Sequence, residues 1–139
     1  MDATFELFDH TADMGVRVRA ETWEDLVVAA IEGFYATIGV LVAGGEESAF
    51  HFQRRGDDDA TLLRDFLNEL LILFERDKRR AVRIEGVRFS RRELVVAATT
   101  AAIDPERSEY HREVKAITYH ELAIRNLDGG YEATFIVDI

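Results

Sequence analysis

A short polar segment near the N-terminus carries the densest group of reactive side chains. Asp9 and Asp13 flank His10 and Thr11, between two stretches with strand-like alternation. Because a turn between strands can aim neighbouring side chains at one point, these groups could bind a hard cation or exchange protons. Asp and Thr are also ordinary turn formers, through hydrogen bonds to the backbone. The segment alone leaves a structural and a chemical role open.

The last two residues, Asp138 and Ile139, form a second candidate site. Apolar residues alternate along the preceding segment, 131–137, which predicts a final strand. A chain that ends in a strand brings its α-carboxylate next to the Asp138 carboxylate, and two negative groups so close attract a cation. A frayed, solvated terminus is the alternative.

Lys115 and His120 lie in a segment, 113–120, whose alternation predicts a strand. The alternation places Lys115 and Ile117 on one face and His120 on the other. Lys115 could approach a phosphate or a partner, or it could lay its methylene groups along the sheet and keep its ammonium in water. His120 could bind a metal or make structural hydrogen bonds. Two roles therefore remain open for each residue.

Two helices are predicted to position these residues. Thr22 is typical of an N-cap, with Asp25 three residues later, and apolar residues then recur at helical spacing over 26–38. The second helix is predicted to begin after the aspartates 57–59, which favour the positive end of the helix dipole, and its apolar stripe covers 62–74.

About eight strands complete the predicted α+β fold. The basic run 78–80 is predicted to end the second helix, because cations favour a helix C-terminus. We expect one compact domain over residues 1–139, with the helices covering one face of mixed or antiparallel sheet layers. The expected strands are 4–9, 14–20, 49–53, 81–89, 93–101, part of 113–126, and 131–137.

The composition excludes several classes of function. The chain has 27 Asp and Glu against 17 Lys and Arg, a net charge of −10, which disfavours sequence-independent binding to nucleic acid. It has no cysteine, so thiol chemistry and Cys-ligated metals are absent. Phosphate-binding glycine motifs and common hydrolase motifs are also missing, so any nucleotide would be held by another protein. Without a signal peptide or a membrane-spanning stretch, we expect a cytoplasmic protein.

Five segments taken together resemble the archease family, and the resemblance extends over residues 5–139. One position departs from the family pattern, because Ser108 stands where members commonly have histidine, and the nearby His111 is out of register. Any role of that histidine is therefore not carried over to this position. The segments that carry the resemblance are Phe8–Gly15, Phe66–Leu71, Asp104–Arg107, Lys115–His120 and Val137–Ile139.

The resemblance implies a protein cofactor, not an enzyme: an activator of RtcB-type RNA ligases, which join RNA ends in tRNA splicing, tRNA processing and RNA repair. Members of the family promote GTP-dependent guanylylation of the ligase and let it turn over repeatedly. The family's metal site maps to Asp13, Asp138 and a main-chain or terminal oxygen of Ile139, and its functional lysine maps to Lys115. Ca²⁺ is the ion expected in a structure, and Mg²⁺ or Mn²⁺ in function.

The implied partner is the ligase, which would hold the GTP; we expect neither stable nucleic-acid binding nor membrane binding. A rival hypothesis is a metal-dependent phosphoesterase that uses Asp9, His10, Asp13 and His120 to activate water. It requires turnover by the isolated protein. Under the activator hypothesis, Asp9, His10 and His120 are candidates for partner contact. A third hypothesis, suggested by the acidity, is a chaperone-like adaptor for RNA-modifying enzymes.

Overall fold

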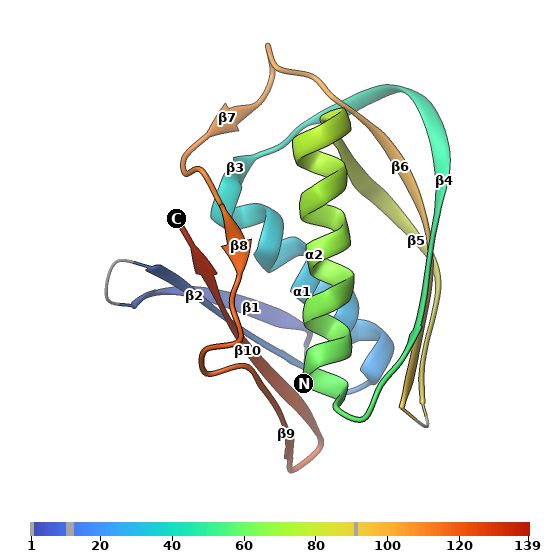
Figure 1. The fold of residues 1–139 in the computed structure, drawn as a ribbon, viewed down its shortest axis with the longest axis vertical. Coiled ribbons are helices and arrows are strands. Elements are labelled where there is room, and N and C mark those ends of the chain that lie inside the picture. Colours follow the sequence, from blue (N-terminus) through green and yellow to red (C-terminus); the bar gives the residue numbers. More distant parts are fainter. Residues whose placement is uncertain (1, 11–12, 91) are drawn as a thin grey trace.

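A computed structural model describes residues 2–10, 13–90 and 92–139. Its main sheet has the strand order β1-β2-β10-β8, and β9 also pairs with β10 (Figure 1). Every pairing in this sheet is antiparallel. Because β2 occupies one edge of β10, the strands β8 and β9 share the other edge, one after the other. The strands are β1 (Thr4–His10), β2 (Asp13–Ala20), β8 (Ala116–Ile117), β9 (Ala123–Leu127) and β10 (Gly130–Asp138).

A second antiparallel sheet contains the longest strands, in the order β4-β6-β5. They are β4 (Ala43–Arg55), β5 (Arg79–Ser90) and β6 (Glu93–Ile103). The predicted strands 81–89 and 93–101 are thus found within β5 and β6, which pair with each other; Arg91, between them, lies outside the described residues. The strands β3 (Gly39–Val40) and β7 (Glu109–Tyr110) form a small third pair.

The helices α1 (Trp23–Ile38) and α2 (Asp59–Asp77) lie between the two larger sheets (Figure 1). The helix α1 packs on β1, β2 and β10 and reaches β5, whereas α2 packs on the β4-β6-β5 sheet and reaches β8 and β9. The N-cap of α1 is the predicted one, since Thr22 accepts the N–H of Asp25 at 3.1 Å. The helix α2 begins among the three predicted aspartates, and Asp58 caps it by accepting the N–H of Ala60 at 3.3 Å. The helices therefore cover one face of each sheet, as expected.

A continuous hydrophobic core joins the helices to the inner faces of both sheets. The main sheet contributes alternate residues of β2 and β10, which are opposite each other in the register and are fully or almost fully buried. Such burial removes these apolar side chains from water and fixes the register, since a slip of one residue would turn them to the outside. The core of this sheet includes Val16, Val18, Ala133, Phe135 and Val137.

The basic run 78–80 does not end the second helix as predicted. Lys78 alone caps α2, in a left-handed conformation with φ 53°, and its N–H donates to the carbonyl of Phe74. Arg79 and Arg80 already belong to β5 and pair with β6. The Arg79 guanidinium donates to the carbonyl of Thr100 at 2.9 Å, so strand pairing outweighs the local helix-end preference.

The hydroxyl of Tyr35 links α1 to the edge of the second sheet by accepting the N–H of Ala81 at 2.9 Å. Burial raises the pKa of Tyr35 to about 12. No helix in the described part of the chain is both long enough and apolar enough to cross a membrane.

Candidate functional site

The predicted site residues Asp13 and Asp138 meet at the end of the main sheet. They are Cα partners on the last pair between β2 and β10. Residues directly opposite in an antiparallel pair point to the same face, with Cβ atoms about 4.5–5.5 Å apart. Neither carboxylate has an ion pair or hydrogen bond with another residue that the structure describes. Two carboxylates therefore stand side by side with no counter-ion among the described residues.

Lys115 and Ile139 lie next to this aspartate pair. The N–H of Lys115 donates to the carbonyl of Asp138 at 2.7 Å, which fixes the backbone of Lys115 beside β10. The Lys115 side chain is exposed, and no described residue forms an ion pair with it. Ile139 is half-buried and packs against the core, so the segment after Asp138 is anchored and not frayed. The structure thus brings together the four residues that the resemblance singled out.

The oxygen donors at this end of the sheet fit a hard divalent cation. Asp13 and Asp138 offer carboxylates, and Ile139 offers a main-chain oxygen, which are the ligand types of Ca²⁺ and Mg²⁺. Facing like charges destabilise a strand pair, and a bound cation would reverse that effect. The carbonyl of Asp138 already accepts the Lys115 N–H, so the free donors are the side chains and Ile139.

The N-terminal group of candidates is divided between the two faces of β1. His10 is the Cα partner of Asp13, whereas Asp9 is the partner of Met14, whose side chain is buried in the core. Since successive residues of a strand point to opposite faces, Asp9 lies on the other face from His10 and Asp13. Thr11, the hydroxyl in this hypothesis, lies outside the described residues. The structure therefore does not place Asp9 on the same face as His10.

The segment that carries His120 is not the continuous strand that we predicted. Only residues 116–117 pair with β10 as β8, and the chain then leaves the sheet edge in a turn before β9. On α2, Arg64 donates to the carbonyl of Ile117 at 2.9 Å and stacks on the Tyr119 ring at 4.4 Å. These contacts tie the end of β8 to α2, while the N–H of Thr118 still donates to the carbonyl of Ile136 in β10 at 2.9 Å.

The turn brings His120 to His10, with ring centroids 5.2 Å apart in an edge-on arrangement. Glu121, the next residue, places its carboxylate beside both rings. Sequence reasoning missed Glu121, although its position directly after His120 was a signal that could have found it. His10 thus lies on the same face as Asp13 and Asp138, and His120 and Glu121 meet it at this end of the main sheet.

The remaining charges on this face of the sheet are paired. Glu132 of β10 is almost fully buried between Arg19 of β2 and Arg125 of β9, and it forms ion pairs with both. Hydrogen bonds from Arg125 and then Arg19 hold the pKa of Glu132 below its ordinary value, although burial acts in the opposite direction. This network stabilises the three-strand register that places Asp138 opposite Asp13.

The segment around Ser108, where the sequence departs from the family pattern, has a structural role. The hydroxyl of Ser108 accepts the N–H of Val42 at 2.9 Å and donates to the Val42 carbonyl at 3.2 Å. Arg107 forms an ion pair with Asp104 at 2.7 Å. His111 is exposed, and its N–H donates to the carbonyl of Ile38 at 2.7 Å. Ser108 thus fastens this segment to the chain near Val42.

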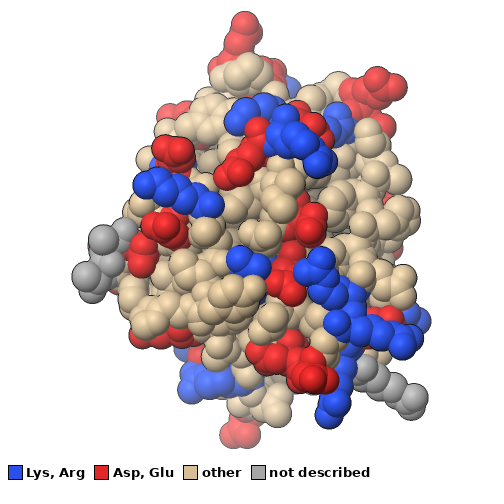
Figure 2. Space-filling model, in the orientation of Figure 1, with Lys and Arg blue, Asp and Glu red and all other residues tan. Residues whose placement is uncertain are grey.

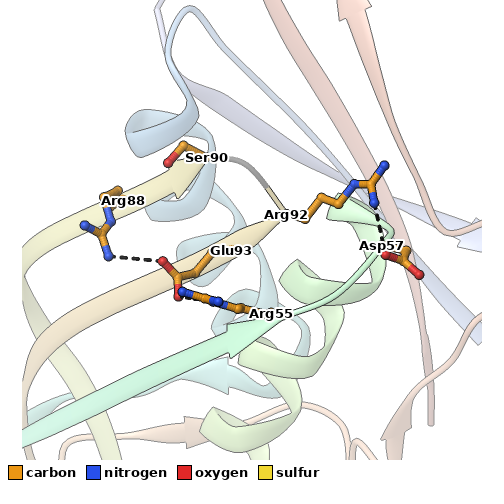
Figure 3. Close-up of a pocket in the computed structure, with 6 residues that line it drawn as sticks. All are labelled: Arg55, Asp57, Arg88, Ser90, Arg92 and Glu93. Carbon is orange, nitrogen blue, oxygen red and sulfur yellow. Dashed lines mark hydrogen bonds and ion pairs between the residues drawn. The ribbon is translucent and has the colours of Figure 1, made fainter.

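A pocket between the ends of β4, β5 and β6 also gathers polar groups, with a volume of about 540 Å³ (Figure 3). Glu93 pairs with Arg55 at 3.1 Å and with Arg88 at 3.2 Å, and Arg92 pairs with Asp57 at 3.4 Å. One carboxylate, that of Glu93, is thus shared by two arginines, and three arginines face two carboxylates in the lining. Acidic and basic groups also alternate across the face shown in Figure 2, so the net charge is not gathered into one acidic patch there.

The fold and this site together define a class of small α+β proteins, in which two helices lie between antiparallel sheets and an aspartate pair joins the last strand to the second. The chain belongs to the archease family. The family model described as "Archease protein family (MTH1598/TM1083)" matches residues 5–139. The fold predicted from the resemblance is thereby confirmed.

Curated relatives and solved structures of the family match this protein over almost the whole chain. Protein archease of Methanopyrus kandleri is 33% identical over 146 residues, which cover 97% of this chain and 99% of that protein. The solution structure of Methanobacterium thermoautotrophicum protein 1598 has a TM-score of 0.75 at 26% identity, covering 97% of this chain and 98% of that one. The crystal structure of an archease described as a possible chaperone, from Thermotoga maritima, has a TM-score of 0.71 at 22% identity and covers 96% of both chains.

Proposed function

We propose that this protein activates an RtcB-type RNA ligase in tRNA splicing and RNA repair, by promoting GTP-dependent guanylylation of the ligase and its multiple turnover. The observation that supports this proposal most is the aspartate pair Asp13 and Asp138, unpartnered among the described residues and flanked by Ile139 and Lys115. Membership in the archease family supplies the biological context.

The residues at the end of the main sheet have two different roles in this proposal. Asp13, Asp138 and an oxygen of Ile139 would hold a divalent cation, which supplies positive charge for neutralising a phosphate when it is bound. Lys115 has an exposed ammonium that can approach a phosphate oxygen of the partner's nucleotide as a point charge. The hydrogen bond from its N–H to the Asp138 carbonyl holds the backbone of Lys115 beside the cation donors.

The covalent chemistry belongs to the ligase in this proposal. The chain has no glycine-rich phosphate cradle, so GTP and the guanylylated residue would lie in the partner. This protein would dock the end of its main sheet at the ligase cleft that contains metal and nucleotide. His10 and His120, on the same face as the aspartate pair, are candidates for contact there.

The test is RNA ligation by a limiting amount of the cognate ligase with GTP and Mn²⁺, with and without this protein. Products per ligase and the guanylylated fraction of the ligase are measured together. The proposal predicts many turnovers and faster guanylylation only when the protein is present. Unchanged values for both quantities, with folded protein and the true partner, would contradict it.

A metal-dependent phosphoesterase is the second candidate, and the approach of His10, His120 and Glu121 favours it. With Asp9 on the opposite face of β1, the hypothesis retains Asp13 as its aspartate. It predicts hydrolysis of a phosphodiester such as bis(4-nitrophenyl) phosphate by the isolated protein with Mn²⁺. Absence of turnover that depends on His120 would contradict this candidate. The adaptor hypothesis instead predicts binding to several RNA-modifying enzymes without a change in ligation.

A further inference from the structure

Three side chains from distant parts of the chain converge beside the aspartate pair. His10 ends β1, while His120 and Glu121 belong to the turn between β8 and β9. Their ligand atoms all lie within 4.8 Å of one another. Among the described residues, no other group of three histidine or acidic side chains is that compact. We call these three residues the histidine–glutamate cluster.

The contacts within the cluster do not form a good hydrogen-bond network. The Nε2 atom of His10 is 3.4 Å from Oε2 of Glu121, and Nε2 of His120 is 3.8 Å from Oε1 of the same carboxylate. Both distances exceed those of ordinary N–H···O bonds. The Nδ1 atom of His10 is buried and has no hydrogen-bond partner in the described part of the chain. A structural role through hydrogen bonds therefore does not account for the two rings.

The backbone of the turn that carries the cluster is strained at Glu121. Glu121 has φ 54°, in the left-handed region, which costs a residue other than glycine about 1–2 kcal/mol. The N–H of His120 donates to Oγ1 of Thr118 at 3.2 Å, which tightens the same turn. A glutamate therefore occupies a position where glycine would cost less, and its carboxylate lies beside both imidazoles. Strain of this kind is characteristic of functional sites.

We propose that the histidine–glutamate cluster binds a transition-metal ion of the Zn²⁺ class. Two imidazoles and one carboxylate are the donor set of open Zn²⁺ sites, and Co²⁺ and Ni²⁺ also bind imidazole. Bonds of about 2.1 Å in tetrahedral geometry place ligand atoms about 3.4 Å apart. His120 and Glu121 are exposed and can close that gap on His10, which the β1 strand positions.

This site differs in chemistry from the aspartate pair beside it. The aspartate pair offers only oxygen donors, which favour Ca²⁺, Mg²⁺ or Mn²⁺, whereas the cluster offers two nitrogens and selects softer cations. His10 and Asp13 are Cα partners, so the two sites are neighbours without sharing a ligand. Three protein ligands leave one coordination position open, which a water or a group of a partner can occupy.

Zn²⁺ binding to the isolated full-length protein tests this assignment, measured by competition with a chromophoric chelator. The variants His120→Ala and Glu121→Gln change exposed side chains of the turn, and His51→Ala is the matched control, an exposed histidine on the second sheet. We expect one Zn²⁺ per native chain, a loss of affinity of about tenfold or more in each turn variant, and native affinity in the control. Equal affinity in all four proteins, or no uptake by the native chain, would overturn the proposal.

A second arm separates this site from the aspartate pair. Asp138→Asn should keep the Zn²⁺ affinity of the native protein, whereas loss of Zn²⁺ binding in this variant would overturn the cluster as the site. With Co²⁺ in place of Zn²⁺, a visible absorption band should form in the native protein and be lost in His120→Ala. No RNA ligase is present in these measurements, so failure of the activator proposal would leave their outcome unchanged.

Discussion

Asp13 and Asp138 face each other across β2 and β10, although they lie at opposite ends of the chain. Replacing Asp138 with Asn should remove a repulsion between like charges, so without divalent metal the variant should be more stable by about 0.2–1 kcal/mol. Added Ca²⁺ should then stabilise the native protein and not the variant, because it binds the folded aspartate pair. Urea unfolding in EDTA and in Ca²⁺ measures both effects. A variant that is less stable in EDTA and still stabilised by Ca²⁺ would contradict the metal site.

The variant Lys115→Ala should separate two roles of the site, cation binding by the aspartate pair and phosphate contact by the lysine. The Lys115 backbone N–H, not its side chain, bonds to Asp138, so the variant should retain Ca²⁺ affinity and stability within about 0.5 kcal/mol. Its activation of guanylylation should fall by about tenfold or more, because a charge contact to a phosphate is lost. Calorimetric Ca²⁺ titration and a guanylylation assay check the two halves. Guanylylation at the native rate would rule out the role assigned to this side chain.

Arg64 of α2 holds β8, through its hydrogen bond to the carbonyl of Ile117 at 2.9 Å. Arg64→Ala should lower the local free energy of opening by about 1–1.5 kcal/mol, which speeds amide exchange by about tenfold. The amides of Lys115 and Thr118, bonded to β10, report this opening. Hydrogen exchange measured by NMR should show the change there and leave the amides of β6 unaffected. Unchanged exchange at both amides would show that Arg64 does not fasten β8.

Helices and long strands could be predicted from the sequence because their signals are local. Thr22 and the apolar spacing after it define the start of α1, and the alternation after Gly130 defines β10. The region around His120 could not be predicted in this way, since β8 ends after Ile117 where Arg64 of α2 takes its carbonyl. A contact between distant segments leaves no periodic pattern.

The candidate site could be predicted only in part, because its residues are brought together by contacts between distant segments. The aspartate pair depends on a strand pairing between the two ends of the chain, which the family resemblance implied and spacing alone left undecided. Asp9 was grouped with His10 because they are adjacent, but strand alternation sends them to opposite faces. Glu121 was missed because a turn, not a strand, brings it to His10.

The buried Glu132 should make the free energy of unfolding depend on pH in the acidic range. Its folded-state pKa is held below the ordinary value by Arg125 and Arg19, so its contribution is present above about pH 4.3 and is lost as pH falls through the lowered pKa. Glu132→Gln should cost about 1–3 kcal/mol at pH 7, and this difference from the native protein should shrink below pH 4.

Urea unfolding at pH 7 and pH 3 measures this dependence. Glu6→Gln, which removes an exposed partner of Arg17, is the matched control and should change stability by less than about 1 kcal/mol at either pH. A constant difference between native protein and Glu132→Gln at both pH values would show that Glu132 is not the titrating group.

The most direct test of the account is multiple-turnover RNA ligation with Asp138→Asn. Asp128→Asn is its control, because it makes the same charge change at an exposed turn between β9 and β10. With limiting ligase, GTP and Mn²⁺, we predict many products per ligase with the native protein and with Asp128→Asn, and about one with Asp138→Asn. Native turnover numbers with a folded Asp138→Asn protein would contradict the claim that the aspartate pair carries the activation.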